Sequence, residues 1–318
     1  MTKKQESKNV GIIFLIVLLL NIAISALELF LEFRGISLGV WSTVLVELFI
    51  FIPVFVYLKM HNEPFFETLG FHKIKISTII LTIALNIVIT PIWVFGNLFS
   101  QLFVPNTFSQ AATGMISNSG FLAIAVVSFM PPIFEEILCR GFIFNKYRKT
   151  SSILSAALFS GLLFGILHLN INQFCYAFLI GVIFAMVNVA SGSIFTSMIL
   201  HLLINGFNML MLYASMLTAE MTGVDGIAQA EASRQTTGRY IMVAIMFVVA
   251  LLFALLTKKL MQVIAKNEGH LDEFNSMFKK AEAEPEDKAS VFTVPSVVSV
   301  ILGAVVTLFI SFVLPTLV

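Results

Sequence analysis

Three ionisable residues lie within six positions of an otherwise apolar stretch, FMPPIFEEILCRGF at residues 129–142. Glu136 and Arg140 are four residues apart, so on a helix they share one face and can form an ion pair. Glu135 points about 100° away and is left without that partner. A charged residue inside a membrane helix costs roughly 2.5–3.5 kcal/mol, so such residues usually face protein or water and carry function.

Two of the five histidines also lie in apolar segments, His168 in SGLLFGILHLN and His201 in SMILHLLINGFN. His201 and Asn205 are four residues apart and share a helix face. Gly161 and Gly165 form a small-residue face that lets a neighbouring helix approach just before His168. The remaining histidines lie in polar segments and are predicted to be surface residues: His61, His72 and His270.

A carboxylate, two imidazoles and a carboxamide are sufficient to hydrolyse an amide. A buried glutamate can take a proton from water that one histidine orients. The second histidine and Asn205 can donate hydrogen bonds to the developing oxyanion. The same groups could bind zinc through Glu135, His168 and His201, because two imidazoles and a carboxylate are a known catalytic set. There is no HExxH motif, and spacing alone does not choose between the two schemes.

Two other nucleophiles have little support. No GxSxG motif is present, which argues against serine chemistry. Cys139 lies near Glu135 on the same segment, but a cysteine nucleophile needs a thiolate environment. Cys139 and Cys175 are both predicted to be small buried structural residues.

Membrane helices must position these residues. The chain is 58% hydrophobic and only 12% charged, with a mean hydropathy of +0.96, whereas soluble domains carry about 25% charged residues. We predict an all-α fold, a polytopic membrane helical bundle of about eight or nine transmembrane helices around an intramembrane polar active-site cavity. The apolar runs lie at residues 10–30, 38–58, 77–99, 121–145, 152–169, 173–190, 193–213, 240–257 and 291–315.

The basic residues predict the orientation, because most of the 19 fall on one side of these spans. That side is assigned to the cytoplasm together with the N-terminus, and the first span is read as a retained helix. The inner residues are Lys3, Lys4, Lys8, Lys59, Lys73, Lys75, Lys146, Arg148, Lys149, Lys258, Lys259, Lys266, Lys279, Lys280 and Lys288, and the outer ones are Arg34, Arg234 and Arg239. Residues 100–120 and 214–238 then form outer loops, and 258–290 forms an inner connector with one surface helix.

Pro131 and Pro132 predict that a new helix begins near Ile133, with Glu135 in its opening turn. This helix and the next form a hairpin around residues 149–151, which places Glu135 and His168 at similar depth. Two residues fit this arrangement less well. His201 lies close to the inner end of its span, at a different depth. Glu47, alone in the second span, either lines the same cavity or pairs with another helix, and pairing is favoured.

Three motifs now stand in order on successive membrane segments: EEILCR at 135–140, FGILH at 164–168 and HLLIN at 201–205. With this pattern, EExxxR, FxxxH and HxxxN, the chain resembles the CPBP family of intramembrane proteases. These are the CAAX-processing and bacteriocin-processing endopeptidases, also called Abi proteins. The resemblance covers about residues 121–215.

The resemblance implies roles for the motif residues. Glu135 would be the general base, His168 would position the water, and His201 and Asn205 would stabilise the oxyanion. Glu136, Arg140 and Phe164 would support the site. The resemblance also implies a cavity open toward the cytoplasmic side. Family members have been described as metalloproteases, but a glutamate mechanism without a cofactor is favoured over zinc.

The predicted function is therefore an intramembrane endopeptidase in a multi-pass protein of the bacterial plasma membrane. Its substrate would be a peptide or protein, either prenylated or the precursor of a peptide pheromone or bacteriocin. The net charge of +1, without a basic stripe, gives no indication of nucleic-acid binding, and the oligomeric state is left open. The alternatives are a non-proteolytic membrane scaffold or regulator of a sensor kinase or envelope enzyme, and a proton-coupled transporter.

Three segments are expected: N-terminal transmembrane helices at 1–120, the catalytic core at 121–215, and an outer loop, C-terminal helices and connector at 216–318.

Overall fold

The computed structural model describes residues 1–233, 236–279 and 289–314 and forms a bundle of helices, with no strand in these ranges. This confirms the predicted fold class. In chain order the elements are α1 (Lys3–Phe33), α2 (Val40–Met60), α3 (Phe65–Leu69), α4 (Ile76–Ser100), α5 (Thr107–Ser119), α6 (Phe121–Glu136), the π-helix η1 (Ile137–Phe144), α7 (Asn145–Thr150), α8 (Ile153–Leu167), α9 (Ile171–Ser191), α10 (Phe195–Thr222), α11 (Gly226–Ala232), α12 (Thr237–Glu268), α13 (Leu271–Ser276), α14 (Val294–Leu308) and the π-helix η2 (Phe309–Val313).

Each of the nine predicted apolar runs contains a helix in its described residues, and eight helices in the described ranges are long and apolar enough to cross a membrane. The ninth, α8, has 15 residues and is therefore about 22 Å long. That length is shorter than the roughly 30 Å of hydrocarbon in a bilayer. His168 follows its last residue, so the short helix ends inside the bundle rather than beyond it.

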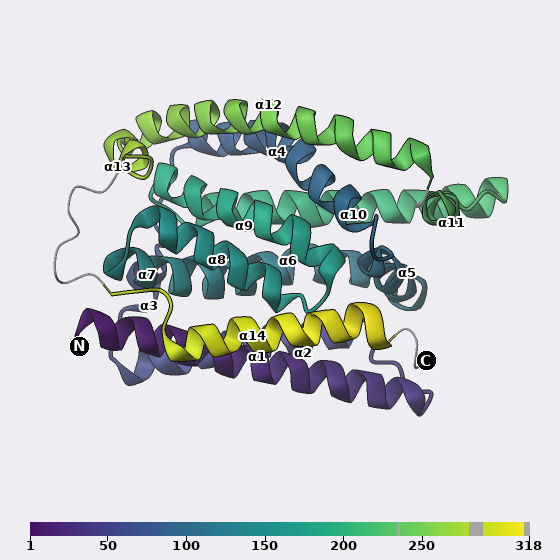
Figure 1. Ribbon diagram of the computed structural model, residues 1–318, viewed down its shortest axis with the longest axis horizontal. Coiled ribbons are helices and arrows are strands. Elements are labelled where there is room, and N and C mark those ends of the chain that lie inside the picture. Colours follow the sequence, from purple (N-terminus) through teal and green to yellow (C-terminus); the bar gives the residue numbers. More distant parts are fainter. Residues whose placement is uncertain (234–235, 280–288, 315–318) are drawn as a thin grey trace.

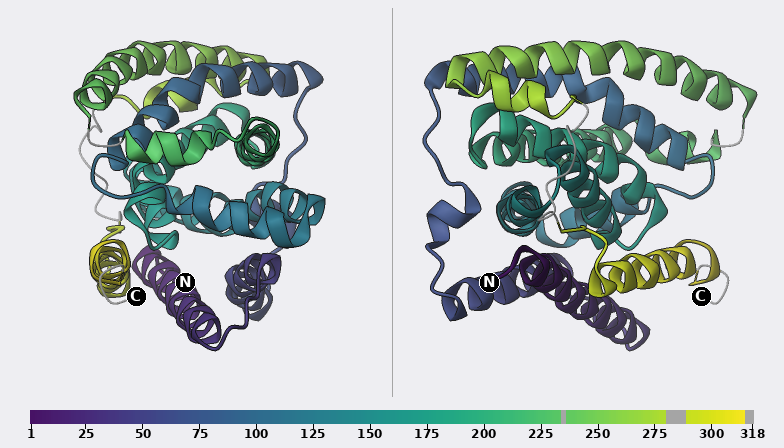
Figure 2. Two further views of the ribbon diagram at one scale, coloured as in Figure 1. Left: turned by 90° about the vertical axis from the view of Figure 1, so that its right-hand side faces the viewer. Right: turned by 60° about the vertical axis from the view of Figure 1, so that its left-hand side comes forward.

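The helices are arranged in three layers (Figure 1). α4 and α12 pack together on one side, and α1, α2 and α14 lie on the opposite side, as both further views confirm (Figure 2). Between them lie α6, α8, α9 and α10, which carry the three motifs. The middle layer is the most enclosed, since 61% of the apolar window of α9 is buried against 17% for α12.

Small residues let α8 and α9 approach closely, as the glycine pattern predicts. A Cβ on Gly161 would lie 3.0 Å from the backbone nitrogen of Val182 in α9. A Cβ on Gly181 would lie 2.9 Å from the Cα of Gly161. Gly165 packs against the ring of Phe174 in the same way. These contacts fix the helix that leads to His168 against the centre of the bundle.

The predicted helix start at Ile133 is wrong. α6 runs without interruption from Phe121 to Glu136, with Pro131 and Pro132 inside it, and Glu135 lies in its last turn. A proline removes the hydrogen bond to the carbonyl four residues earlier, and neighbouring helices can satisfy that carbonyl in a membrane bundle. Here the Asn205 side chain does so, because its Nδ2 donates to the Val127 carbonyl over 3.3 Å.

Several segments predicted as loops contain helix. The first outer loop contains α5, and α10 and α12 continue past their predicted ends to Thr222 and Glu268. The inner connector does contain one short surface helix, α13. The predicted positions of Arg234, Lys280 and Lys288 lie outside the described residues.

Candidate active site

The site begins where α6 passes into the π-helix η1. Glu136 is the last residue of α6, and its Oε1 accepts a hydrogen bond from Arg140 Nη1 over 2.9 Å. Both side chains are fully buried. The Arg140 guanidinium also lies over the rings of Phe164, at 4.2 Å, and Phe184, at 5.1 Å. The predicted ion pair is therefore present, and aromatic faces enclose its positive end.

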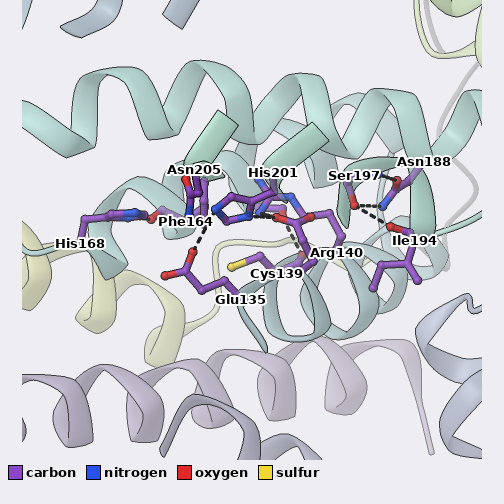
Figure 3. Close-up of polar contacts among 12 residues, drawn as sticks. Glu135, Cys139, Arg140, Phe164, His168, Asn188, Ile194, Ser197, His201 and Asn205 are labelled. Atoms are coloured by element: carbon purple, nitrogen blue, oxygen red, sulfur yellow. Dashed lines mark hydrogen bonds and ion pairs between the residues drawn. The ribbon is translucent and has the colours of Figure 1, made fainter. Parts of the chain in front are cut away.

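His201 lies between the two adjacent glutamates, and Figure 3 shows its contact with Glu135. Its Nδ1 is 3.0 Å from Glu136 Oε1, and its Nε2 is 3.7 Å from Glu135 Oε2. A carboxylate can only accept, so Nδ1 donates to Glu136 and Nε2 faces Glu135. Glu135 Oε2 is buried and has no hydrogen-bond partner. An unpartnered carboxylate oxygen beside an oriented imidazole is available to take a proton.

His201 reaches the depth of the glutamates because α10 begins inside the bundle. A Cβ on Gly141 of η1 would lie 3.1 Å from Ile194, the residue before α10. Counting back from Gly141, Glu135 is six residues away, and counting forward from Ile194, His201 is seven residues away. The two helices cover similar distances from that contact, so their functional residues meet. The depth difference expected from the sequence is thereby resolved.

Asn188 of α9 holds the start of α10 in place. Its Oδ1 accepts from the backbone nitrogen of Ser197 over 3.1 Å, and its Nδ2 donates to the Ser197 hydroxyl over 2.9 Å (Figure 3). A side-chain acceptor at a helix N-terminus satisfies an otherwise free backbone donor. The sequence alone did not single out Asn188, because its partner becomes clear only when α9 and α10 are placed together.

His168 follows α8, and its ring is separated from that of His201 by Phe164. The Phe164 ring centroid is 5.0 Å from the His168 ring and 5.7 Å from the His201 ring, edge-on to both. His168 Nδ1 donates to the Phe164 carbonyl over 2.9 Å, which leaves Nε2 free. Phe164 thus holds both imidazoles at fixed orientations.

Helices from both ends of the chain hold the turn after His168. Leu169 has a φ of +53°, a conformation that is uncommon for a residue with a side chain. On one side of the turn, Asn21 of α1 donates to the Leu167 carbonyl over 2.6 Å. On the other, the Ile171 backbone nitrogen donates to the Ser311 hydroxyl of η2 over 3.1 Å.

Asn205 lies one turn beyond His201 on α10 and is half-buried. Its hydrogen bond to Val127 uses one of its two N–H groups, so the other N–H and the carbonyl oxygen remain available. Figure 3 shows the Asn205 side chain near the His201 ring, with Glu135 on the opposite side of that ring.

Glu47 adds a carboxyl group beside Glu135. The sequence interpretation favoured pairing with another helix, but Glu47 Oε2 is buried without a hydrogen-bond partner. The two glutamates are close enough to interact electrostatically. One turn further along α2, the Phe51 ring contacts that of Phe134, with centroids 5.4 Å apart. The face of α2 that carries Glu47 and Phe51 therefore packs against the end of α6.

Residues 117–207 match the family model for the type II CAAX prenyl endopeptidases, described as Rce1-like. The matched segment includes all three motifs and every residue predicted for the site. Over these residues the chain is similar to the CAAX-type intramembrane proteases. The comparison with curated proteins and with solved structures gave no match.

CAAX-type proteases are peptide hydrolases, so the protein is an enzyme that acts on peptide or protein substrates in a membrane. Its helices make it an integral multi-pass membrane protein. Glu47, Asn21 and Ser311 lie outside the matched residues, and so the surroundings of this CAAX-type protease site extend beyond the family motifs.

The donors predicted for zinc are Glu135, His168 and His201. Among the described residues, no three histidine, cysteine, aspartate or glutamate side chains are gathered closely enough to hold a metal ion. His168 and His201 lie on either side of Phe164, and His201 Nδ1 is engaged by Glu136.

Proposed function

We propose that the protein is an endopeptidase that uses Glu135 to activate water within the membrane. The observation that carries this proposal is the pair of adjacent glutamates on either side of His201. Glu136 engages Nδ1 of the imidazole, whereas Glu135 keeps an unpartnered oxygen 3.7 Å from Nε2. Burial makes such electrostatic groups more effective than they would be in water.

In the proposed reaction, the Glu135 carboxylate takes a proton from a water that His168 orients through its free Nε2. The hydroxide oxygen forms a bond to the scissile carbonyl carbon, and the negative charge moves to the carbonyl oxygen. Nε2–H of His201 and the free N–H of Asn205 donate to that oxyanion. Glu135 then passes the proton to the leaving amine as the C–N bond breaks, which yields a carboxylic acid and an amine.

For this role His201 donates from both ring nitrogens. The Arg140 guanidinium pairs with Glu136, which lowers the cost of burying that carboxylate beside His201. Arg140 acts here through Glu136 and has no contact with the reacting atoms.

The proposed substrate is a peptide or a small membrane-associated protein, prenylated or the precursor of a secreted peptide. The proposed location is a bacterial plasma membrane, and the distribution of basic residues supports a cytoplasmic N-terminus. Comparing the peptides of cells that carry the wild type and Glu135→Gln would identify the substrate, because only peptides that depend on Glu135 would differ.

The direct test uses Glu135→Gln, which keeps the shape of the side chain and removes the base. We expect cleavage of a peptide library by the detergent-purified protein to fall by roughly 10²–10⁴-fold, the usual contribution of a general base. Glu67→Gln in α3, far along the chain from the motifs, is the matched control and should cleave normally. Folding is checked by size-exclusion profile and thermal unfolding.

Cleavage by Glu135→Gln at the wild-type rate would refute the assignment of the base. If, in addition, the cellular phenotype is unchanged in this variant, the scaffold function is favoured instead.

A further inference from the structure

A cavity of about 250 Å³ lies between α4, α5, α9 and α10. It is placed toward the C-terminal end of α4 and beyond Asn205 on α10, at the end of the bundle that carries α5 (Figure 1). The hairpin at residues 149–151 lies at the other end. With the N-terminus in the cytoplasm, the cavity is in the outer half of the membrane, whereas the family resemblance implies a cavity open to the cytoplasm.

The cavity adjoins the proposed catalytic groups. Tyr176 of α9 lines it and is close enough to Glu135 to interact with it electrostatically. Asn208, also in the lining, is three residues after Asn205 on the same helix. A chain held in the cavity would therefore lie within about one helical turn of Asn205.

The lining combines polar and apolar side chains and carries no charged group. Asn97, Asn106 and Asn208 supply carboxamides, Ser109 and Ser215 supply hydroxyls, and aromatic rings form much of the remaining wall. The Asn97 carboxamide is already oriented, because its Oδ1 accepts from Asn172 over 2.9 Å. Such groups match the alternating donors and acceptors of an extended peptide backbone.

Trp93 supplies a second polar feature, since it lines the cavity and its Nε1 is buried without a hydrogen-bond partner. Burying a donor without a partner is unfavourable, and a ligand carbonyl would provide the missing acceptor. A prenyl chain offers no such acceptor and would leave the carboxamides of the wall unpaired. The chemistry of the lining therefore favours peptide over isoprenoid.

We propose that this cavity binds the uncharged segment of the peptide substrate next to the scissile bond. The inference rests on the proposed function, since it makes the cavity part of the same protease. The cavity is smaller than the roughly 300–1,000 Å³ of sites for drug-sized ligands, so it holds one or two residues rather than a whole peptide. The substrate would extend from Glu135 toward the outer side of the membrane.

Binding can be measured without catalysis, because the chain contains two tryptophans, Trp41 and Trp93. In Trp41→Phe/Glu135→Gln protein, Trp93 is the single fluorescent reporter of the cavity. Titration with capped, uncharged hexapeptides is expected to give a saturable change in its emission, whereas farnesol gives none. Adding Asn208→Leu should weaken peptide binding at least tenfold. Asn118→Leu, on the exposed face of α5, is the matched control and should bind normally.

Cleavage specificity provides the second measurement. With a peptide library, Asn208→Leu is expected to change the residue preference at one or two positions on one side of the cleaved bond and to leave the other side unaltered. An unaltered preference, with unaltered Trp93 titration, overturns the inference while Glu135-dependent cleavage still supports the protease. A Trp93 response to farnesol but not to peptide also overturns it. If the wild type and Glu135→Gln cleave the library equally while peptides still change the Trp93 emission, only the proposed function is contradicted.

Discussion

Replacing Glu136 with glutamine leaves the Arg140 guanidinium buried without a charged partner. Glu136 Oε1 is the acceptor of the Arg140 Nη1 hydrogen bond, and Arg140 Nε and Nη2 have no hydrogen-bond partner. Breaking a fully buried pair by removing one member typically costs about 3–5 kcal/mol. The contacts of Arg140 with Phe164 and Phe184 persist in the variant, so they do not offset this loss. We expect the ratio of folded to unfolded protein to fall by roughly 10² to 10⁴.

The assay is a double-mutant cycle on thermal and denaturant unfolding in detergent, with Glu136→Gln, Arg140→Gln and the double variant. Because the double variant buries no unpaired charge, it should recover at least half of the stability lost in Glu136→Gln. Its cleavage activity should remain at least about tenfold below wild type, because His201 Nδ1 has lost the carboxylate that orients it. Wild-type stability in Glu136→Gln, or full activity in the double variant, would refute the reasoning.

Four further outcomes are expected. Asn205→Ala should lower kcat by about 10²–10³ through loss of an oxyanion donor, with a stability loss of only about 1 kcal/mol for its bond to Val127; an unchanged kcat would remove it from the mechanism. Glu47→Leu should raise stability by about 1–3 kcal/mol, since its buried Oε2 has no partner, yet reduce cleavage, which paired unfolding and activity measurements would reveal. Gly181→Ala should destabilise by about 1–3 kcal/mol in thermal unfolding, because its Cβ would lie 2.9 Å from a backbone atom, whereas Gly206→Ala, with its nearest neighbour at 3.7 Å, should be tolerated. Cleavage should persist after chelation with no metal detected in the sample, and activity restored only by added zinc would contradict the metal-free mechanism.

The local part of the site could be predicted from the sequence. The spacing of Glu136 and Arg140 specifies an ion pair on any helix, and the cost of burying Glu135 marks it as functional. The fold class and the family followed from hydropathy and from three short motifs. All of these depend on positions within one helix or on the order of the motifs, which the sequence contains directly.

The parts that were missed depend on how one helix sits against another. The position of His201 could not be derived from its place in α10, because the depth of that helix is set by the contact of Ile194 with Gly141. The side of α2 on which Glu47 faces is set by rotation of the helix about its axis, which one charge does not define. The prediction from the prolines failed for a related reason. The carbonyl of Val127, which loses its helical hydrogen bond, accepts instead from Asn205, 78 residues later in the chain.

The turn that carries His168 is held by Asn21 near the start of the chain and by Ser311 near its end. During synthesis, the segment with all three motifs leaves the ribosome about 100 residues before Ser311, as the last motif ends at residue 205. The nascent protein therefore contains all three motifs before Ser311, which holds the turn after His168, has been synthesised. A premature stop after residue 293 would spare every motif and still leave the turn after His168 supported by Asn21 alone.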